Sequence, residues 1–177
     1  MPESFDNSDS PVNPINRTGV FLMSALLNEI LDPKLVVLEL REATAAEAIL
    51  EIVQLLRDNG LVDDFYKLAD AVMEREGRTS TNTGVGVAFP HARTDLVDRI
   101  VLGIGRSTKG LLFGHSPELV HLIFLIGVPQ RRVTDYLVCV GALARVVKDK
   151  KGRDALMTAK TAEDFVELLR TGSLAVE

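Results

Sequence analysis

A histidine that follows a proline and a run of small residues is the strongest candidate for chemistry in this sequence. Pro90 fixes the backbone immediately before the imidazole of His91. An imidazole with a reference pKa of about 6.5 is largely neutral near pH 7, so one ring nitrogen is a free nucleophile. Glycine amides and hydroxyl groups nearby can surround an anion. The small and hydroxyl residues of this segment include Ser80, Thr81, Gly84, Gly86 and Ala88. The combination favours phosphoryl capture, in which positioning and charge neutralisation do most of the work.

Arg75 is a second candidate, at the end of the helix predicted before this segment. A guanidinium that returns to the histidine would bind phosphate oxygens through two parallel hydrogen bonds. From residue chemistry alone, two interpretations of His91 and Arg75 stay open. They form a phosphoryl site, or they are a histidine at a strand end and an arginine on a solvated helix face.

The other two histidines and the single cysteine offer less chemistry. His121 lies inside an apolar segment and is interpreted as a partly buried, hydrogen-bonded strand residue, with catalysis as the less favoured alternative. His115 precedes Pro117 in a predicted loop, where we expect it to be solvated. Together with Cys139 they lack the C-x-x-C or H-E-x-x-H spacing of zinc sites, so we expect no metal site.

Two glycine motifs resemble nucleotide-binding loops, and both fail. After Gly84-Val-Gly86 the third glycine of G-x-G-x-x-G is replaced by Phe89, and the segment leads into Pro-His rather than into a helix. In the stretch from Gly105 to Gly110 the lysine precedes the second glycine instead of following it. A nucleotide-dependent enzyme therefore has little support.

Helices and strands alternate in the predicted secondary structure. Thr44-Ala-Ala-Glu47 is a capping box that opens a helix ending near residues 59–60. Further helices are predicted at 19–31, from near 63 to a stop at Gly77, at 133–147, near 154–157 and from a cap at Thr161 onwards. Strands are predicted at 35–40, up to Phe89, at 100–105 and at 120–128. This order predicts an α/β protein in which helices cover a central sheet.

Composition limits the remaining classes. The chain has 177 residues, with 20 Lys and Arg against 25 Asp and Glu, which suits one acidic domain and argues against nucleic-acid binding. Residues 1–18 hold three of the seven prolines and no apolar run, so we predict a disordered N-terminal tail before a domain at 19–177, not a signal peptide. The longest apolar stretch, 122–128, is far short of the roughly 20 residues that span a bilayer, and a single cysteine suits a reducing compartment. We expect a cytoplasmic protein without direct membrane insertion.

One stretch resembles a family signature. Residues 74–91, Glu-Arg-Glu-Gly-Arg-Thr-Ser-Thr-Asn-Thr-Gly-Val-Gly-Val-Ala-Phe-Pro-His, look like the active-site signature of the fructose/mannitol-type enzyme IIA domains of the bacterial phosphoenolpyruvate-dependent phosphotransferase system. That family includes the nitrogen-regulatory IIA proteins. The G-x-A-x-P-H core follows an upstream E-R-E and S-T, and the likeness extends over roughly residues 21–172. The family fold is a single α/β domain with a mixed central sheet and flanking helices, which agrees with the predicted elements.

The resemblance implies roles for individual residues. His91 matches the histidine that accepts a phosphoryl group from the histidine carrier protein HPr or its nitrogen-branch relative. Arg75 matches the arginine that neutralises phosphate, and Thr81 matches the signature threonine, with Ser80 and Gly86 expected to contribute to phosphate binding. No cofactor is implied, because the donor is itself a phosphohistidine.

The sequence departs from the family pattern in two places. Asn82-Thr83 stands where glycine followed by isoleucine or leucine is usual. The family commonly places a second histidine at the start of the helix after the long strand, and that position is Tyr136 here. A tyrosine can donate a hydrogen bond to the phosphate at pH 7 but adds no positive charge.

The sequence therefore predicts a protein-histidine phosphotransferase of the IIA type, a phosphocarrier that is regulatory rather than dedicated to one sugar. The chain is too short to carry a IIB cysteine domain or a membrane-spanning IIC unit as well, so we expect a separate IIB protein or a regulatory target as partner. The alternative is a non-catalytic IIA-like binding module that keeps the shape of the site and is rarely phosphorylated. Tyr136 and Asn82 are the support for that alternative.

Overall fold

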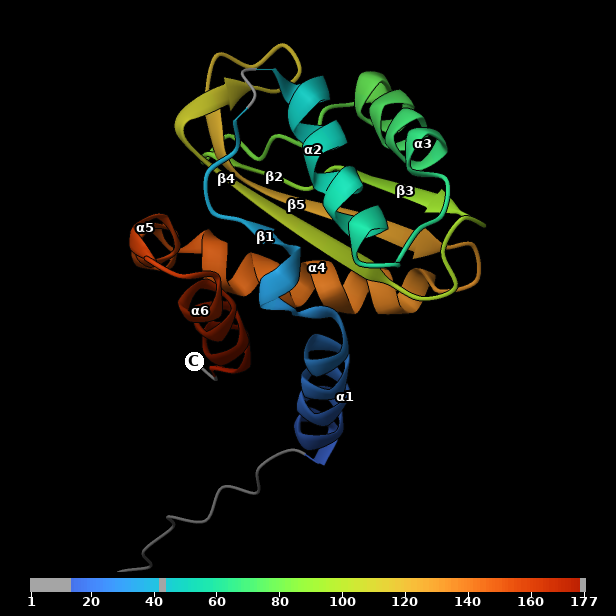
Figure 1. Cartoon of the computed structure of the whole chain (residues 1–177). Coiled ribbons are helices and arrows are strands. Elements are labelled where there is room, and N and C mark those ends of the chain that lie inside the picture. The colour runs from blue at the N-terminus through green and yellow to red at the C-terminus, as the bar shows by residue number, and fades with distance from the viewer. Residues whose placement is uncertain (1–13, 42–43, 176–177) are drawn as a thin grey trace, which may run out of the picture.

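A five-stranded mixed β-sheet forms the centre of the protein (Figure 1). The computed structural model describes residues 14–41 and 44–175. The strands lie in the order β1 (Val36–Val37), β4 (Val101–Leu112), β5 (Leu119–Pro129) and β2 (Val87–Ala88), and β3 (His91–Thr94) also pairs with β5. Strands β4 and β5 are antiparallel, whereas β1 is parallel to β4, and both β2 and β3 are parallel to β5. The mixed sheet expected from the family resemblance is confirmed.

Strand β5 is apolar on both faces because the sheet is covered on both sides. Leu122, Phe124 and Ile126 pack into one core, whereas Ile123 and Leu125 pack into the other. The strand therefore carries an unbroken apolar run instead of the alternating pattern of a half-exposed strand. This burial fixes the register of the shorter strands beside it, since a shift by one residue would exchange the two faces.

Two groups of helices form the outer layers. Helices α2 (Ala45–Asp58) and α3 (Phe65–Arg78) cover one face of the sheet, and α4 (Val133–Lys148) crosses the other (Figure 1). Helices α1 (Pro14–Ile30), α5 (Lys150–Thr158) and α6 (Ala162–Leu174) pack on the α4 side. Helix α2 approaches the sheet closely at Gly103, where an added Cβ would lie 2.5 Å from Cγ2 of Ile52.

The capping motifs predicted the starts of two helices, and the structure confirms both. Thr44 and Glu47 form the predicted capping box at α2, and Oγ1 of Thr161 accepts from the backbone N–H of Asp164 at the start of α6. Glycine did not end α3 as predicted, because the helix continues past Gly77 to Arg78. Nothing lies within 4 Å of a Cβ placed on Gly77, so the residue sits on an open helix surface. There its cost of about 1 kcal/mol relative to alanine is offset by packing of the opposite face.

Helix α1 begins earlier than predicted. It starts at Pro14, a residue type that the first turn of a helix tolerates, so residues 14–18 of the predicted tail are helical. The rest of that tail, residues 1–13, lies outside the described residues.

The strand predicted at 35–40 is shorter than expected. Asp32 caps a 3₁₀ turn (Pro33–Leu35), which leaves only Val36–Val37 as β1. The backbone N–H of Leu40 still donates to the carbonyl of Arg106, 2.7 Å away, so the segment keeps its place beside β4. In the part of the chain that the structure describes, no helix is long and apolar enough to cross a membrane.

Candidate functional site

His91 is the first residue of β3, at the edge of the sheet. Its Nδ1 lies 2.9 Å from the backbone carbonyl oxygen of Phe89, two residues earlier. A carbonyl oxygen can only accept, so Nδ1 carries the ring proton and donates it. The Pro90 carbonyl accepts from Ile126 of β5, which anchors the backbone between the two residues. The neutral imidazole therefore presents an unprotonated Nε2, which has no hydrogen-bond partner among the described residues.

Burial and charge both keep His91 neutral. The side chain is half-buried, and desolvation lowers the pKa of His91 below its ordinary 6.5. The positive charge of Arg75 lowers the same pKa further, against the opposing effects of the Phe89 hydrogen bond and the Glu76 carboxylate. Nε2 is consequently a free lone pair at neutral pH, which is the protonation state that a phosphoryl acceptor needs.

Tyr136 lies directly beside His91, on the first turn of α4. The two ring centroids are 5.0 Å apart with their planes at 35°. The phenolic oxygen is 3.5 Å from Nδ1 of His91, the outer limit of a hydrogen bond, and the Nδ1 proton already points to Phe89. Burial raises the pKa of Tyr136 above 10, so the hydroxyl is neutral and its hydrogen is available to another acceptor.

Arg75 reaches the same place from the last turn of α3. Its Nη1 donates to the backbone carbonyl of Thr79, 2.9 Å away, which turns the guanidinium toward the loop that leads to His91. The charge of Arg75 lowers the pKa values of both His91 and Tyr136, so it acts on both rings. Across residues 14–41 and 44–175, Arg75 forms no ion pair that would neutralise it. A guanidinium in this position can bind an anion beside His91.

Glu76 organises the loop after α3, a role that the sequence analysis missed. Its Oε1 accepts from the Ser80 hydroxyl at 2.8 Å and from the Thr81 N–H at 2.7 Å, and its Oε2 accepts from the Thr81 hydroxyl at 2.7 Å. Both predicted phosphate-binding hydroxyls are thus held by one carboxylate next to Arg75. The signal available in the sequence was an acidic residue at the end of the predicted helix, four residues before Ser80 and five before Thr81.

The structure does not bring Gly86 to His91. The Gly86 carbonyl accepts from the backbone N–H groups of His121 and Leu122, whereas His91 lies beside Ile126, four residues further along β5. Four strand residues correspond to about 13 Å. Gly86 has a φ of 84°, so its role is a backbone turn that only glycine adopts easily.

Asn82, the departure from the family glycine, connects two loops. Its Nδ2 donates to the carbonyls of Phe113 (3.4 Å) and Glu118 (3.1 Å), and its Oδ1 accepts from the N–H of Gly84 at 2.9 Å. A glycine has no side chain to make these contacts. The substitution therefore ties the signature loop to the connection between β4 and β5.

The remaining candidates lie outside this site. His121 is half-buried in β5 and donates from Nδ1 to the Ser107 carbonyl at 2.9 Å, which confirms its interpretation as a hydrogen-bonded strand residue. His115 is exposed. Cys139 is buried, and burial raises the pKa of its thiol to about 12. Within the described ranges, no group of three or more His, Cys, Asp or Glu side chains is placed to hold a metal ion.

Comparison with known proteins gives a family for this arrangement. The profile of the family described as "Phosphoenolpyruvate-dependent sugar phosphotransferase system, EIIA 2" matches residues 29–172, most of the chain. The chain belongs to this family. The family is one of phosphotransfer proteins, which supports a phosphocarrier role in the phosphotransferase system.

Individual relatives of this EIIA protein agree with the match. The "PTS system fructose-specific EIIA component" of Haloferax volcanii is 34% identical over 137 residues, which cover 77% of this chain and 89% of that relative. The crystal structure of "Nitrogen Regulatory Protein IIA-Ntr" from Neisseria meningitidis superposes with a TM-score of 0.74 at 29% identity, and the alignment covers 81% of this chain and 99% of that one. The "PTS system fructose-specific EIIABC component" of Bacillus subtilis is 24% identical over 144 residues, 81% of this chain but 23% of its own length.

Proposed function

We propose that this EIIA protein carries a phosphoryl group on Nε2 of His91 and receives it from phospho-HPr or from the nitrogen-branch relative of HPr. The observation that supports this most directly is the Nδ1 hydrogen bond to Phe89, because it leaves Nε2 unprotonated and able to act as the nucleophile. The lowered pKa of His91 keeps it in that state at neutral pH.

The proposed transfer is an in-line displacement between two histidines. The Nε2 lone pair of His91 forms the new N–P bond while the P–N bond in the donor breaks, and that electron pair returns to the donor imidazole. The phosphoryl oxygens remain on phosphorus throughout. The Nδ1 proton of His91 stays in its hydrogen bond to Phe89, so the positive charge that develops on the ring is stabilised by a carbonyl dipole. No metal or cofactor takes part in this balance.

Arg75 and Tyr136 are the proposed phosphate-binding side chains. The Arg75 guanidinium would neutralise part of the phosphoryl charge, and the Tyr136 hydroxyl would donate to one phosphoryl oxygen. Ser80 and Thr81 are held by Glu76 and are assigned a positioning role for the loop that follows Arg75. Gly86 is left out of the phosphate site because of its distance along β5.

An apolar rim beside Tyr136 suits docking of the donor protein. Val133 and Leu137 lie on the first turns of α4 and are 38% and 62% exposed. Exposed aliphatic side chains next to a reactive group are typical of the centre of a protein–protein contact. We therefore place the donor over the N-terminal end of α4 and the start of β3.

Phosphorylation by purified components tests this proposal. The protein is incubated with enzyme I, HPr and phosphoenolpyruvate, and the gain of one phosphoryl group is read by intact mass. We expect an acid-labile label in the unchanged protein, in His115→Ala and in His121→Ala, and none in His91→Ala. A label that persists in His91→Ala refutes the site. An unlabelled but folded unchanged protein, tested with both donor types, would favour the non-catalytic binding module instead.

A regulatory role is the finer part of the proposal. The nitrogen-regulatory relative supports it, whereas the fructose-specific names of other relatives support delivery to a sugar-specific IIB protein. Transfer from the phosphorylated protein to the cysteine of a separate fructose-type IIB protein distinguishes the two. A regulatory protein should keep most of its label over the time in which a sugar-dedicated IIA protein loses it. Rapid and complete transfer would refute the regulatory role.

A further inference from the structure

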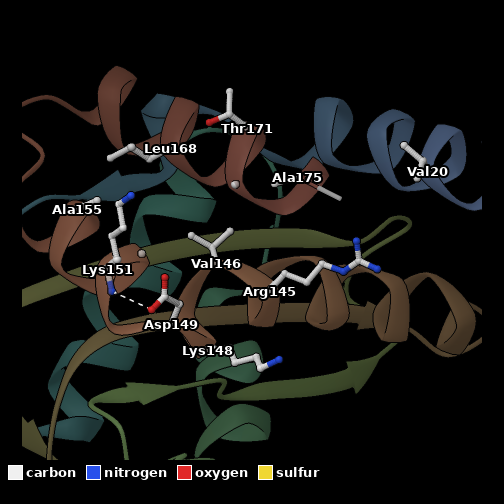
Figure 2. A pocket seen from close by; sticks show the side chains of 12 residues that line it. Val20, Arg145, Val146, Lys148, Asp149, Lys151, Ala155, Leu168, Thr171 and Ala175 are labelled. Carbon is white, nitrogen blue, oxygen red and sulfur yellow. Dashed lines mark hydrogen bonds between the residues drawn. The ribbon is translucent and has the colours of Figure 1, made fainter. Parts of the chain in front are cut away.

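A cavity of about 670 Å³ lies on the opposite end of α4 from His91, between α4, α5, α6 and the start of α1 (Figure 2). The proposed phosphotransfer site does not use it. Tyr136 is at the first turn of α4, whereas Arg145, Val146 and Lys148 line the cavity from the last turns. Nine residues of helix between Tyr136 and Arg145 correspond to about 13 Å. The cavity is therefore separate from the site around His91.

The floor of the cavity is apolar, and glycine keeps it open. Val146 lies at its centre, with Leu168 and Ala155 beside it (Figure 2). A Cβ on Gly172 of α6 would lie 3.1 Å from Cγ2 of Val146, so a larger residue there would fill this space. A Cβ on Gly152 of α5 would overlap the carbonyl oxygen of Val146. The close approach of α5 to the end of α4 depends on that glycine.

The rim of the cavity is positively charged. Arg145 and Lys151 extend on either side of Val146 in Figure 2, and Lys148 adds a third cation at the edge. Asp149 is the acidic lining residue, and its carboxylate is engaged with the backbone N–H of Lys151 at 3.2 Å. Among the residues that the structure describes, the side chains of the three cations form no ion pair. In a protein of net charge −5, three cations around one hollow make this region locally positive.

A second hollow continues the first along α4. It has a volume of about 280 Å³ and shares Val20 and Arg145 with the larger cavity. The rest of its lining is Gly19, Met23, Leu137, Val138, Gly141 and Ala142. Arg145 thus stands between two apolar hollows, an arrangement that suits a ligand with one charged group and an extended apolar part.

We propose that this cavity binds a small organic anion, a carboxylate or phosphate that carries an acyl or aromatic group. Arg145, which stands between the two hollows, binds the charged group, and the surface around Val146 takes the apolar group. A volume of about 670 Å³ falls in the range of small-molecule pockets, which combine apolar walls with a few charged side chains.

Binding of two defined probes to the full-length protein tests the proposal and separates the two chemical sources. Octanoate represents acyl carboxylates and adenosine monophosphate represents aromatic phosphates. Each is titrated to about 5 mM while amide shifts are followed by two-dimensional NMR. We expect at least one probe to give saturable shifts at amides of residues 145–155 and 168–175. Octan-1-ol and inorganic phosphate, which each lack one half of the ligand, should bind at least about tenfold more weakly.

Matched charge changes show whether the rim is responsible. The double variant Arg145→Gln with Lys151→Gln should weaken binding of the probe about tenfold or more. The control, Lys150→Gln with Lys160→Gln, makes the same change of net charge at residues that do not line the cavity, and should stay within about threefold. Ala155→Leu, which fills the floor and keeps all three cations, should also abolish binding. Thermal melting establishes that each variant is folded.

Three results would overturn the proposal. The first is the absence of saturable shifts at these amides with either probe. The second is an equal loss of affinity in the two charge variants, which would show a general attraction and no site. The third is binding of inorganic phosphate as tight as that of the organic probe, which would show an adventitious ion only. None of these outcomes depends on phosphorylation of His91, so the proposal stands or falls independently of the proposed function.

Discussion

Replacing Tyr136 with phenylalanine removes one hydroxyl group and keeps the ring against His91. In the unphosphorylated protein that hydroxyl lies 3.5 Å from Nδ1 of His91, at the limit of a hydrogen bond, so its loss should hardly change stability. In the phosphorylated protein it would donate to a charged oxygen, and such bonds contribute about 1.5–3 kcal/mol. Because Tyr136 is half-buried, we take the lower end of that range. Tyr136→Phe should lower the equilibrium constant for transfer from phospho-HPr about tenfold.

The measurement is the phosphorylated fraction at equilibrium, read by intact mass over a range of ratios of phospho-HPr to acceptor. Tyr66→Phe is the matched control, because Tyr66 is on α3, 66% exposed and away from the site. That control should stay within about twofold of the unchanged protein. If Tyr136→Phe behaves like Tyr66→Phe while both melt normally, the Tyr136 hydroxyl does not bind phosphate and the residue serves only to pack beside His91.

Three further predictions concern charge, pH and packing. Arg75→Lys should slow phosphoryl transfer measured by rapid quench, and Arg75→Ala should slow it more, by about 100-fold, because a bidentate charged contact is lost. The control Arg78→Ala, at an exposed position of the same helix end, should match the unchanged protein. Equal rates in all three variants would show that Arg75 does not bind phosphate. NMR titration should give His91 a pKa below 6.5. The His91 ring then takes up a proton at a higher pH in the unfolded chain than in the folded chain. Protonation therefore favours unfolding, and His91 should make the free energy of unfolding fall as the pH drops below about 6.5. A pKa at or above 6.5 would contradict the burial of the ring. Gly103→Val should lower the free energy of unfolding in urea by about 1–3 kcal/mol, because its Cβ meets Ile52 of α2, whereas Gly141→Ala, with nothing within 4 Å of the new Cβ, should be neutral or stabilising.

Much of the fold was predictable because its signals are local. The capping box at Thr44 needs only residues three apart, and the apolar run of β5 identifies a strand buried on both faces. The cores of α2, α4 and α6 follow from helical spacing in the same way. The polar segment His91–Thr94 carries no such signal. It is a strand because the apolar edge of β5 offers it hydrogen bonds, and that pairing joins residues about 35 positions apart.

The sequence alone determined which residues could do the chemistry, since a histidine after proline, an arginine at a helix end and a tyrosine at a helix start are visible as types and spacings. Tertiary structure decided how these residues are arranged. The Phe89 carbonyl lies 2.9 Å from Nδ1 of His91, which leaves Nε2 as the unprotonated nitrogen. Folding also brings Tyr136 beside His91 across 45 residues, and it places Glu76 where its carboxylate binds Ser80 and Thr81. It also kept Gly86 away by fixing the register of β2 on β5. The physical reason is that protonation state and reach depend on burial, charge and distance among groups that only the packed sheet and helices bring together.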